Sequence, residues 1–161
     1  MTTRLYSNEL KALVVPESIL EQPNVLQEKC LTIQWMNYKC QRERNNRGEA
    51  YGPTQPVEME FTIRLNDTAD AKPFYQMLPS NEHFCFSFLF NATFNQNERL
   101  NDYEDGMVCD GYVVGIDESY SASSNKEPND KQMLLNIKLL LLNTTYIGRD
   151  KNYTSIFIHQ N

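Results

Sequence analysis

The chain has 161 residues and a formal net charge of −6, with 21 acidic against 15 basic side chains. This length favours a single domain, residues 1–161, with a core of its own, and the acidic balance without a Lys/Arg cluster argues against a nucleic-acid-binding protein. The longest apolar runs, Leu10–Val15 and Met133–Leu142, are far shorter than the roughly 20 residues of a membrane-spanning helix, so no membrane insertion is expected. The start, Met1-Thr2-Thr3-Arg4, lacks the apolar region of a signal peptide, which predicts a chain that begins in the cytosol.

The first third of the chain predicts two strands and two irregular connections. Leu10–Val15 is expected to form a strand that ends at Pro16, and Glu17–Lys29 an irregular excursion. Cys30–Glu43 predicts a longer strand, and Gln41–Gln55, which contains Gly and Pro, predicts a loop. Alternation in the longer strand assigns two sets of side chains to opposite faces: Leu31, Ile33 and Trp35 to one, and Met36, Tyr38 and Cys40 to the other.

A strand, a short helix and a second strand form the centre of the predicted fold. Val57–Leu65 alternates apolar and polar residues strictly, which predicts a strand with one buried face. Asp70 is expected to cap a helix of about two turns that ends at Pro79, and His83–Ala92 predicts the next strand. The expected core side chains are Val57, Met59, Phe61, Ile63 and Leu65, then Phe74, Met77 and Leu78, then Phe84, Phe86, Phe88 and Phe90.

The rest of the chain predicts three more strands. Polar segments at Asn95–Gly106, Ser121–Asp130 and Tyr146–Lys151 separate strands expected at Met107–Tyr120, Gln132–Asn143 and Tyr153–His159. In the first of these strands, Tyr112, Val114 and Ile116 alternate with Val113, Gly115 and Asp117. Roughly seven strands in hairpin-like order with one short helix predict a mainly β protein, an antiparallel barrel or sandwich.

The predicted strand at Gln132–Asn143 is apolar on both faces, although an antiparallel sheet usually has one face exposed to solvent. One face carries alternate residues from Met133 to Leu141, and the other still carries Leu134, Leu140 and Leu142. The second face therefore needs a cover. Two covers remain open at this point, the protein's own helix and a neighbouring chain.

No residue pattern indicates an enzyme. The sequence lacks the GxSxG, HExxH, P-loop and GxGxxG motifs, and the acidic loop Asp102–Asp105 lacks the ligand spacing of a calcium site. His83 and Cys85 share one strand face, but no residue in the pattern orients the histidine. The four cysteines, Cys30, Cys40, Cys85 and Cys109, form no CxxC pair and are expected to be reduced and mostly buried. We therefore expect no catalysis, no cofactor and no bound metal.

The order of elements resembles the haemolysin-coregulated protein (Hcp) family of type VI secretion systems, and in particular its Bacteroidetes branch. The resemblance runs from about Cys30 to the C-terminus, although Pro16–Lys29 is longer than the usual link. Its residues are Tyr38-Lys39-Cys40-Gln41 before a Gly/Pro loop, the Val57–Leu65 strand, Phe74-Tyr75-Gln76-Met77-Leu78, Gly111–Tyr120 and the strand after Gln132-Met133.

This resemblance implies a β-barrel of two sheets with a helix on its side. It also implies homohexameric rings that stack into a tube inside a contractile sheath, with a spike protein at the tip and effector cargo in the lumen. Such a subunit is cytoplasmic before firing and is then secreted without a signal peptide. A phage-tail-like tube protein and a monomeric ligand-binding barrel are the alternatives.

Two assembly surfaces are expected on such a subunit. The leucines at 134, 140 and 142 would form a contact through the sheet. The predicted loop Gln41–Gln55 would contact the next ring, where its arginines would meet the acidic side chains of a neighbour. The residues of this second contact are Arg42, Arg44 and Arg47 on one side, and Glu58, Glu60 or the Asp102–Asp105 loop on the other.

Overall fold

The computed structural model describes residues 12–22, 24–122, 131–148, 150 and 153–157. Met1–Arg4 and most of the predicted turn Ser121–Asp130 lie outside the described residues. The first elements are β1 Ala12–Val15, the 3₁₀ helix η1 Gln27–Lys29, β2 Leu31–Arg44, β3 Ala50–Leu65, the 3₁₀ helix η2 Thr68–Ala71 and α1 Lys72–Met77. The later elements are β4 Phe84–Phe90, β5 Thr93–Phe94, β6 Leu100–Asp102, β7 Asp105–Ala122, β8 Lys131–Ile147 and β9 Tyr153–Phe157.

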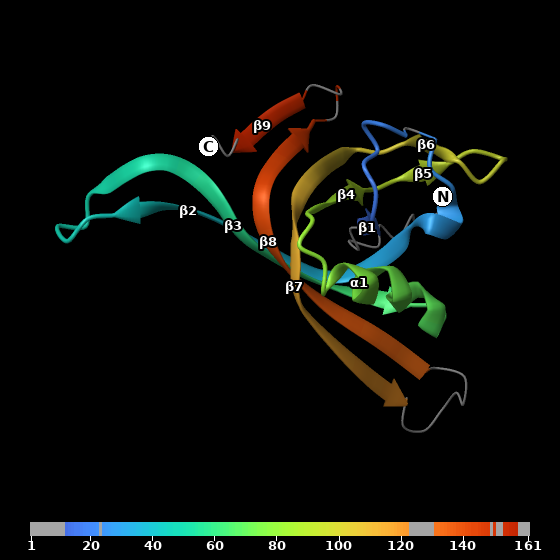
Figure 1. The fold of residues 1–161 in the computed structure, drawn as a ribbon. Coiled ribbons are helices and arrows are strands. Elements are labelled where there is room, and N and C mark those ends of the chain that lie inside the picture. The colour runs from blue at the N-terminus through green and yellow to red at the C-terminus, as the bar shows by residue number, and fades with distance from the viewer. Residues whose placement is uncertain (1–11, 23, 123–130, 149, 151–152, 158–161) are drawn as a thin grey trace, which may run out of the picture.

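The strands pair in a closed circuit. The main sheet has the order β3-β2-β1-β4-β7-β8-β9, and a further pairing joins β3 to β8, so six strands follow one another around a barrel. All these pairings are antiparallel. Figure 1 shows the short helix α1 beside the strands and the β2–β3 hairpin projecting away from them. The predicted antiparallel barrel with one helix on its side is confirmed.

Aromatic side chains fill the barrel. Phe61 from β3 lies edge-on to Phe88 of β4, with ring centroids 5.2 Å apart. Phe74 from α1 stacks on Phe86 of β4 at 6.3 Å. All four rings are fully buried, in the same cluster as Leu135, Ile137 and Leu139 of β8. The buried faces predicted for β3 and β4 are confirmed, except for Val57, whose side chain is not described.

Two β-bulges correct the predicted faces of β2 and β7. Ile33 pairs with Ile63 and Trp35 pairs with Thr62, so Gln34 is an extra residue in β2. Each bulge reverses the alternation after it, because two residues then oppose one on the partner strand. Met36 and Tyr38 therefore face the core with Leu31 and Ile33, whereas Trp35 is 49% exposed. In β7 the extra residue is Val114, so Val113 and Ile116 both pack on the core.

The helix begins differently from the prediction. Asp67, not Asp70, is the N-cap of the 3₁₀ helix η2 that leads into α1, and its side chain accepts a hydrogen bond from the backbone N–H of Ala69. The N-cap of α1 itself is Ala71. The Asp70 carboxylate accepts from the N–H of Asp67 and so completes a capping box. Of the predicted helix face, Phe74 and Met77 are buried, but Leu78 follows the last helical residue and is 38% exposed.

A second core lies outside the barrel, where the connection after β1 crosses β4 and β7. Ile19 and Val25 of this connection pack with Leu89, Leu100 and Val108. The buried Ser87 hydroxyl of β4 accepts a hydrogen bond from the N–H of Ile19 at 2.9 Å and donates to the Glu17 carbonyl at 2.7 Å. The predicted irregular excursion thus holds the outer side of β4 by a buried contact.

The prediction of a loop at Gln41–Gln55 is wrong, because this segment continues β2 and β3 as a hairpin. Gln41 pairs with Gln55 and Arg44 with Ala50. The Asn45 side chain accepts hydrogen bonds from the N–H groups of Arg47 and Glu49, and Gly48 adopts a φ of 79°. Gly and Pro in this stretch therefore accompany a tight turn and an irregular two-stranded ribbon, not the loss of strand structure.

We predict that Ser87→Ala lowers the free energy of unfolding by about 1–3 kcal/mol, because it leaves two backbone groups near the second core without their partner. Urea denaturation would measure this. The matched control is Ser80→Ala, whose hydroxyl accepts from the N–H of Glu82 at an exposed site. Equal, small effects of the two substitutions would contradict the role given to Ser87.

Candidate functional site

The outer face of the sheet formed by β2, β3, β8 and β7 carries most of the predicted interface residues. Cross-strand partners share a face, so a row runs from Lys39 through Glu58 and Leu140 to Tyr112. The next row contains Asn37, Glu60 and Lys138. Five of these residues, Asn37, Lys39, Glu58, Glu60 and Lys138, border a hollow of about 260 Å³ on this face.

The structure excludes one of the two covers considered for the leucines of β8, the protein's own helix, at Leu140. Leu139 faces the core and is 1% exposed, whereas its neighbour Leu140 is 44% exposed. Helix α1 packs through Phe74 against Phe61, on the core side of the sheet. The helix is therefore not the cover for Leu140. Leu134 and Leu142 are half-buried, and a neighbouring chain over this face stays a prediction.

In the structure, each of the predicted acidic residues Glu58 and Glu60 has a basic cross-strand neighbour. Glu58 lies directly opposite Lys39, and Glu60 directly opposite Lys138, so each carboxylate has a basic residue of its own chain across the strands. Opposite charges in such positions attract.

The three hairpin arginines occupy different positions. Arg42 Nε donates a hydrogen bond to the Gly52 carbonyl at 2.9 Å, which ties this side chain across its own hairpin. Arg44 is the last residue of β2, and Arg47 lies in the turn. Both are exposed. Arg44 and Arg47 are thus the positive groups that the hairpin presents at its end.

Sequence reasoning missed two unpaired sheet edges. Among the described strands, Trp35–Arg44 of β2 pairs with β3 alone, because β1 pairs only with Leu31, Thr32 and Ile33. In the same described part, Tyr112–Tyr120 of β7 pairs with β8 alone, because β4 ends its pairing at Gly111. Strand length could have indicated these edges. The predicted strands at Cys30–Glu43 and Met107–Tyr120 are longer than those at Leu10–Val15 and His83–Ala92, so the short strands cannot pair with the long ones along their whole length.

Two tyrosines and a glutamate lie beside the unpaired edge of β7, and we call them the tyrosine patch. Tyr120 donates a hydrogen bond to Glu118 at 2.6 Å. Tyr75 of α1 donates to the same carboxylate, and these two hydroxyls lower the pKa of Glu118 while their own pKa values rise. Tyr120 is 62% and Tyr75 42% exposed. The patch places exposed aromatic surface next to backbone that no described strand other than β8 pairs with.

His83 has an orienting partner that the sequence pattern did not reveal. Its Nδ1 lies 2.6 Å from an Asp110 carboxylate oxygen. This arrangement still lacks an activated nucleophile, because burial raises the pKa of the nearby Cys85 thiol. Burial likewise raises the pKa of Cys30 to about 11 and of Cys109 to about 12, as expected for reduced, unreactive thiols. Within the described residues, no group of three or more His, Cys, Asp or Glu side chains suits a metal ion.

We predict that Leu140→Lys changes the free energy of unfolding by less than about 1 kcal/mol, because the side chain already contacts solvent. Leu139→Lys is the matched comparison and should prevent folding, because it would place a charge in the aromatic core. Circular dichroism and thermal melts measure both variants. Similar destabilisation by the two substitutions would mean that the outer face is buried within the subunit.

No protein-family model and no curated protein sequence matches the chain. Within the described residues, no helix has the length and apolarity to cross a membrane. Solved structures, in contrast, match nearly the whole chain. An Hcp protein aligns with a TM-score of 0.65 at 11% identity, covering 95% of this chain and 99% of its own.

Two further structures give the same result. A mutant form of Hcp1 from Escherichia coli EAEC 042 has a TM-score of 0.64 at 9% identity and covers 91% of this chain and 97% of its own. Hcp1 of Flavobacterium johnsoniae has a TM-score of 0.55 at 11% identity and covers 90% and 98%. At such low identity the likeness is one of fold. The resemblance noted in the sequence is therefore confirmed at that level: this chain has the Hcp fold.

Proposed function

We propose that this protein is a structural subunit that assembles into rings, and that the rings stack into a type VI secretion tube. The observation that carries the proposal is the pair of edges on β2 and β7 that no other described strand pairs with. An exposed edge offers a row of backbone donors and acceptors, and proteins normally cover such edges. Here the two edges bound one four-stranded sheet, β2-β3-β8-β7.

The two edges suit a head-to-tail contact. The edge of β2 on one copy would meet the edge of β7 on the next, which is a heterologous contact that closes when the rotation per copy completes a circle. Each copy would then add four strands to a continuous wall. Six copies per ring is the number implied by the resemblance to Hcp proteins.

Side chains beside the edges support the same contact. The tyrosine patch lies at the β7 edge, and Met36 and Tyr38 lie half-buried on the core side of β2. Tyr, Trp, Phe and Met are enriched in protein interfaces. The leucines of β8 enter the proposal only through side-chain contacts, because the β8 backbone is paired on both sides along most of the strand.

The partners and the location that we propose are those of a subunit of such a tube. Stacked rings would lie inside a contractile sheath, carry a spike protein at the tip and hold effector cargo in the lumen. The subunit would be cytoplasmic before contraction and secreted afterwards without a signal peptide. Its task would be structural, not catalytic. A phage-tail-like tube would use the same edges, whereas a monomeric ligand-binding barrel would need an open interior in place of the buried aromatic cluster.

The test is the substitution Tyr120→Glu, which adds a second carboxylate beside Glu118 at the β7 edge. We expect rings to give way to folded monomers at micromolar concentration, because like charges would have to be buried together in the contact. Analytical ultracentrifugation gives the mass, and electron microscopy shows the rings. The melting temperature of the monomer should change little, because Tyr120 is exposed.

Leu20→Glu is the matched control, since Leu20 is 46% exposed on the connection after β1 and lies at neither edge. It should leave the rings intact. A wild-type protein that stays monomeric at every concentration would contradict ring assembly. Rings that survive Tyr120→Glu unchanged would remove the β7 edge from the contact.

A further inference from the structure

A hollow with an apolar floor lies where β1 ends and β2 begins, beside the helical segment of η2 and α1. Its volume is about 380 Å³, which is within the range of pockets that bind small molecules. Three of its lining residues are buried in the subunit and form the floor: Val15, Leu31 and Met77. The complete apolar part of the lining is Val15, Pro16, Leu31, Ala69, Pro73 and Met77.

The charged part of the lining is acidic. It consists of Glu17, Glu28, Lys29 and Asp70, three carboxylates against one ammonium group. The Asp70 carboxylate accepts hydrogen bonds from the N–H groups of Asn66 and Asp67, so it already has partners within the chain. Glu17 and Glu28 are exposed. They are therefore the carboxylates of this hollow that an incoming group can reach.

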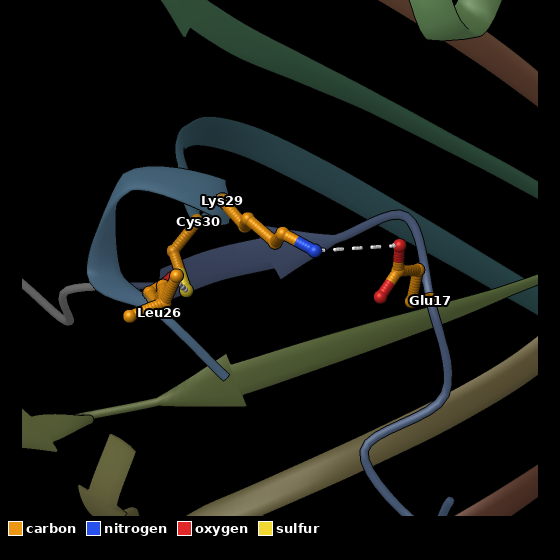
Figure 2. Close-up of polar contacts among 4 residues, drawn as sticks. All are labelled: Glu17, Leu26, Lys29 and Cys30. Atoms are coloured by element: carbon orange, nitrogen blue, oxygen red, sulfur yellow. Dashed lines mark hydrogen bonds and ion pairs between the residues drawn. The ribbon is translucent and has the colours of Figure 1, made fainter. Parts of the chain in front are cut away.

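Lys29 is the one cation that the chain itself contributes to the lining. Figure 2 shows Lys29 and Glu17 facing each other from two passes of the chain, with Nζ and the carboxylate oxygen 3.9 Å apart. This distance is longer than a hydrogen bond, and about half of each side chain is exposed, so water screens the pair. A second cation can therefore compete with Lys29 for Glu17.

Hydrogen bonds fix the backbone on both sides of the hollow. The Glu17 carbonyl accepts a hydrogen bond from the Ser87 hydroxyl at 2.7 Å. The Leu26 carbonyl accepts from the N–H of Lys29 at 3.0 Å and from the Cys30 thiol at 3.7 Å (Figure 2). The two prolines of the lining also have a fixed φ. Binding would thus require little ordering of the lining, which is one of the costs that limit affinity.

We propose that this hollow binds a small organic cation, a primary amine carried on an apolar chain or ring. The ammonium group would pair with Glu17 and Glu28, and the apolar body would cover the floor. The Met77 thioether is flexible and polarisable, so the floor would accept apolar bodies of different shape. This site belongs to the single subunit and does not depend on ring assembly.

The charges of the lining favour a cation over other ligands with the same apolar body. A neutral molecule would gain only the burial of its apolar surface, and an anion would meet an excess of carboxylates. Because Glu17 and Glu28 are exposed, each new ion pair is screened. The expected preference for a cation over a neutral molecule is therefore roughly tenfold at low salt.

The test compares three ligands of one shape, phenylbutylamine, phenylbutanol and phenylbutanoate. Each is titrated into the full-length protein at low salt while the NMR signal of the Met77 methyl group is followed. The amine should shift this signal with a Kd on the order of millimolar and bind roughly tenfold more tightly than the alcohol. Phenylbutanoate should leave the signal unchanged.

Two variants of the rim should change the affinity for the amine in opposite directions. Glu17→Gln/Glu28→Gln should reduce it to that of the alcohol, because the ammonium group loses both partners. Lys29→Gln should raise it severalfold, because the competing cation is removed. Glu82→Gln is the control for a lost charge at an exposed site outside the hollow, and it should leave the affinity unchanged.

A Met77 signal that the amine does not shift would overturn the proposal. Equal affinities for the amine and the alcohol would overturn it as well, as would amine binding that Glu17→Gln/Glu28→Gln leaves unchanged. Thermal melts of the variants show whether they are folded, and all substituted side chains are exposed, so the melting temperature should change little.

Discussion

The structure depends on a mismatch in strand length. β2 and β7 are 14 and 18 residues long, whereas the strands that join them through the back of the barrel, β1 and β4, have 4 and 7. Among the described strands, the barrel is closed only where the short strands reach, and the long strands continue with one side unpaired. Because unpaired edges are templates for further strand pairing, the same mismatch that shapes the subunit directs how copies would join.

Two cores hold the strands of the subunit together. Phe61, Phe74, Phe86 and Phe88 fill the barrel, and the connection after β1 covers the outer side of β4. With both faces of β4 buried, the short side of the barrel is held in place, whereas the four-stranded sheet keeps an outer face with exposed Trp35, Val114 and Leu140. The buried cores thus lie on the short side of the barrel, and exposed apolar side chains lie on the outer face of the four-stranded sheet.

Strict alternation made the strand Val57–Leu65 and the aromatic face of β4 predictable, and solved Hcp structures share the fold of this chain at 9–11% identity. The bulges at Gln34 and Val114 were not predictable, because one extra residue reverses the alternation without a residue type that marks it. The hairpin was mistaken for a loop because its glycines suggested irregular structure, whereas Gly48 lies in a tight turn and Gly52 lies within β3, with φ of 79° and 73°. The unpaired edges depend on which strands are neighbours, which composition does not encode.

Hydrogen–deuterium exchange across the assembly transition tests the central claim most directly. In rings, the amides that face the unpaired sides of Trp35–Arg44 and Tyr112–Tyr120 should be protected as strongly as those of β3 and β8. In dilute monomers they should exchange fast, while the amides of the aromatic core stay protected. If the amide hydrogens of these two edges exchanged equally fast in rings and in monomers, an assembly built on strand pairing would be contradicted.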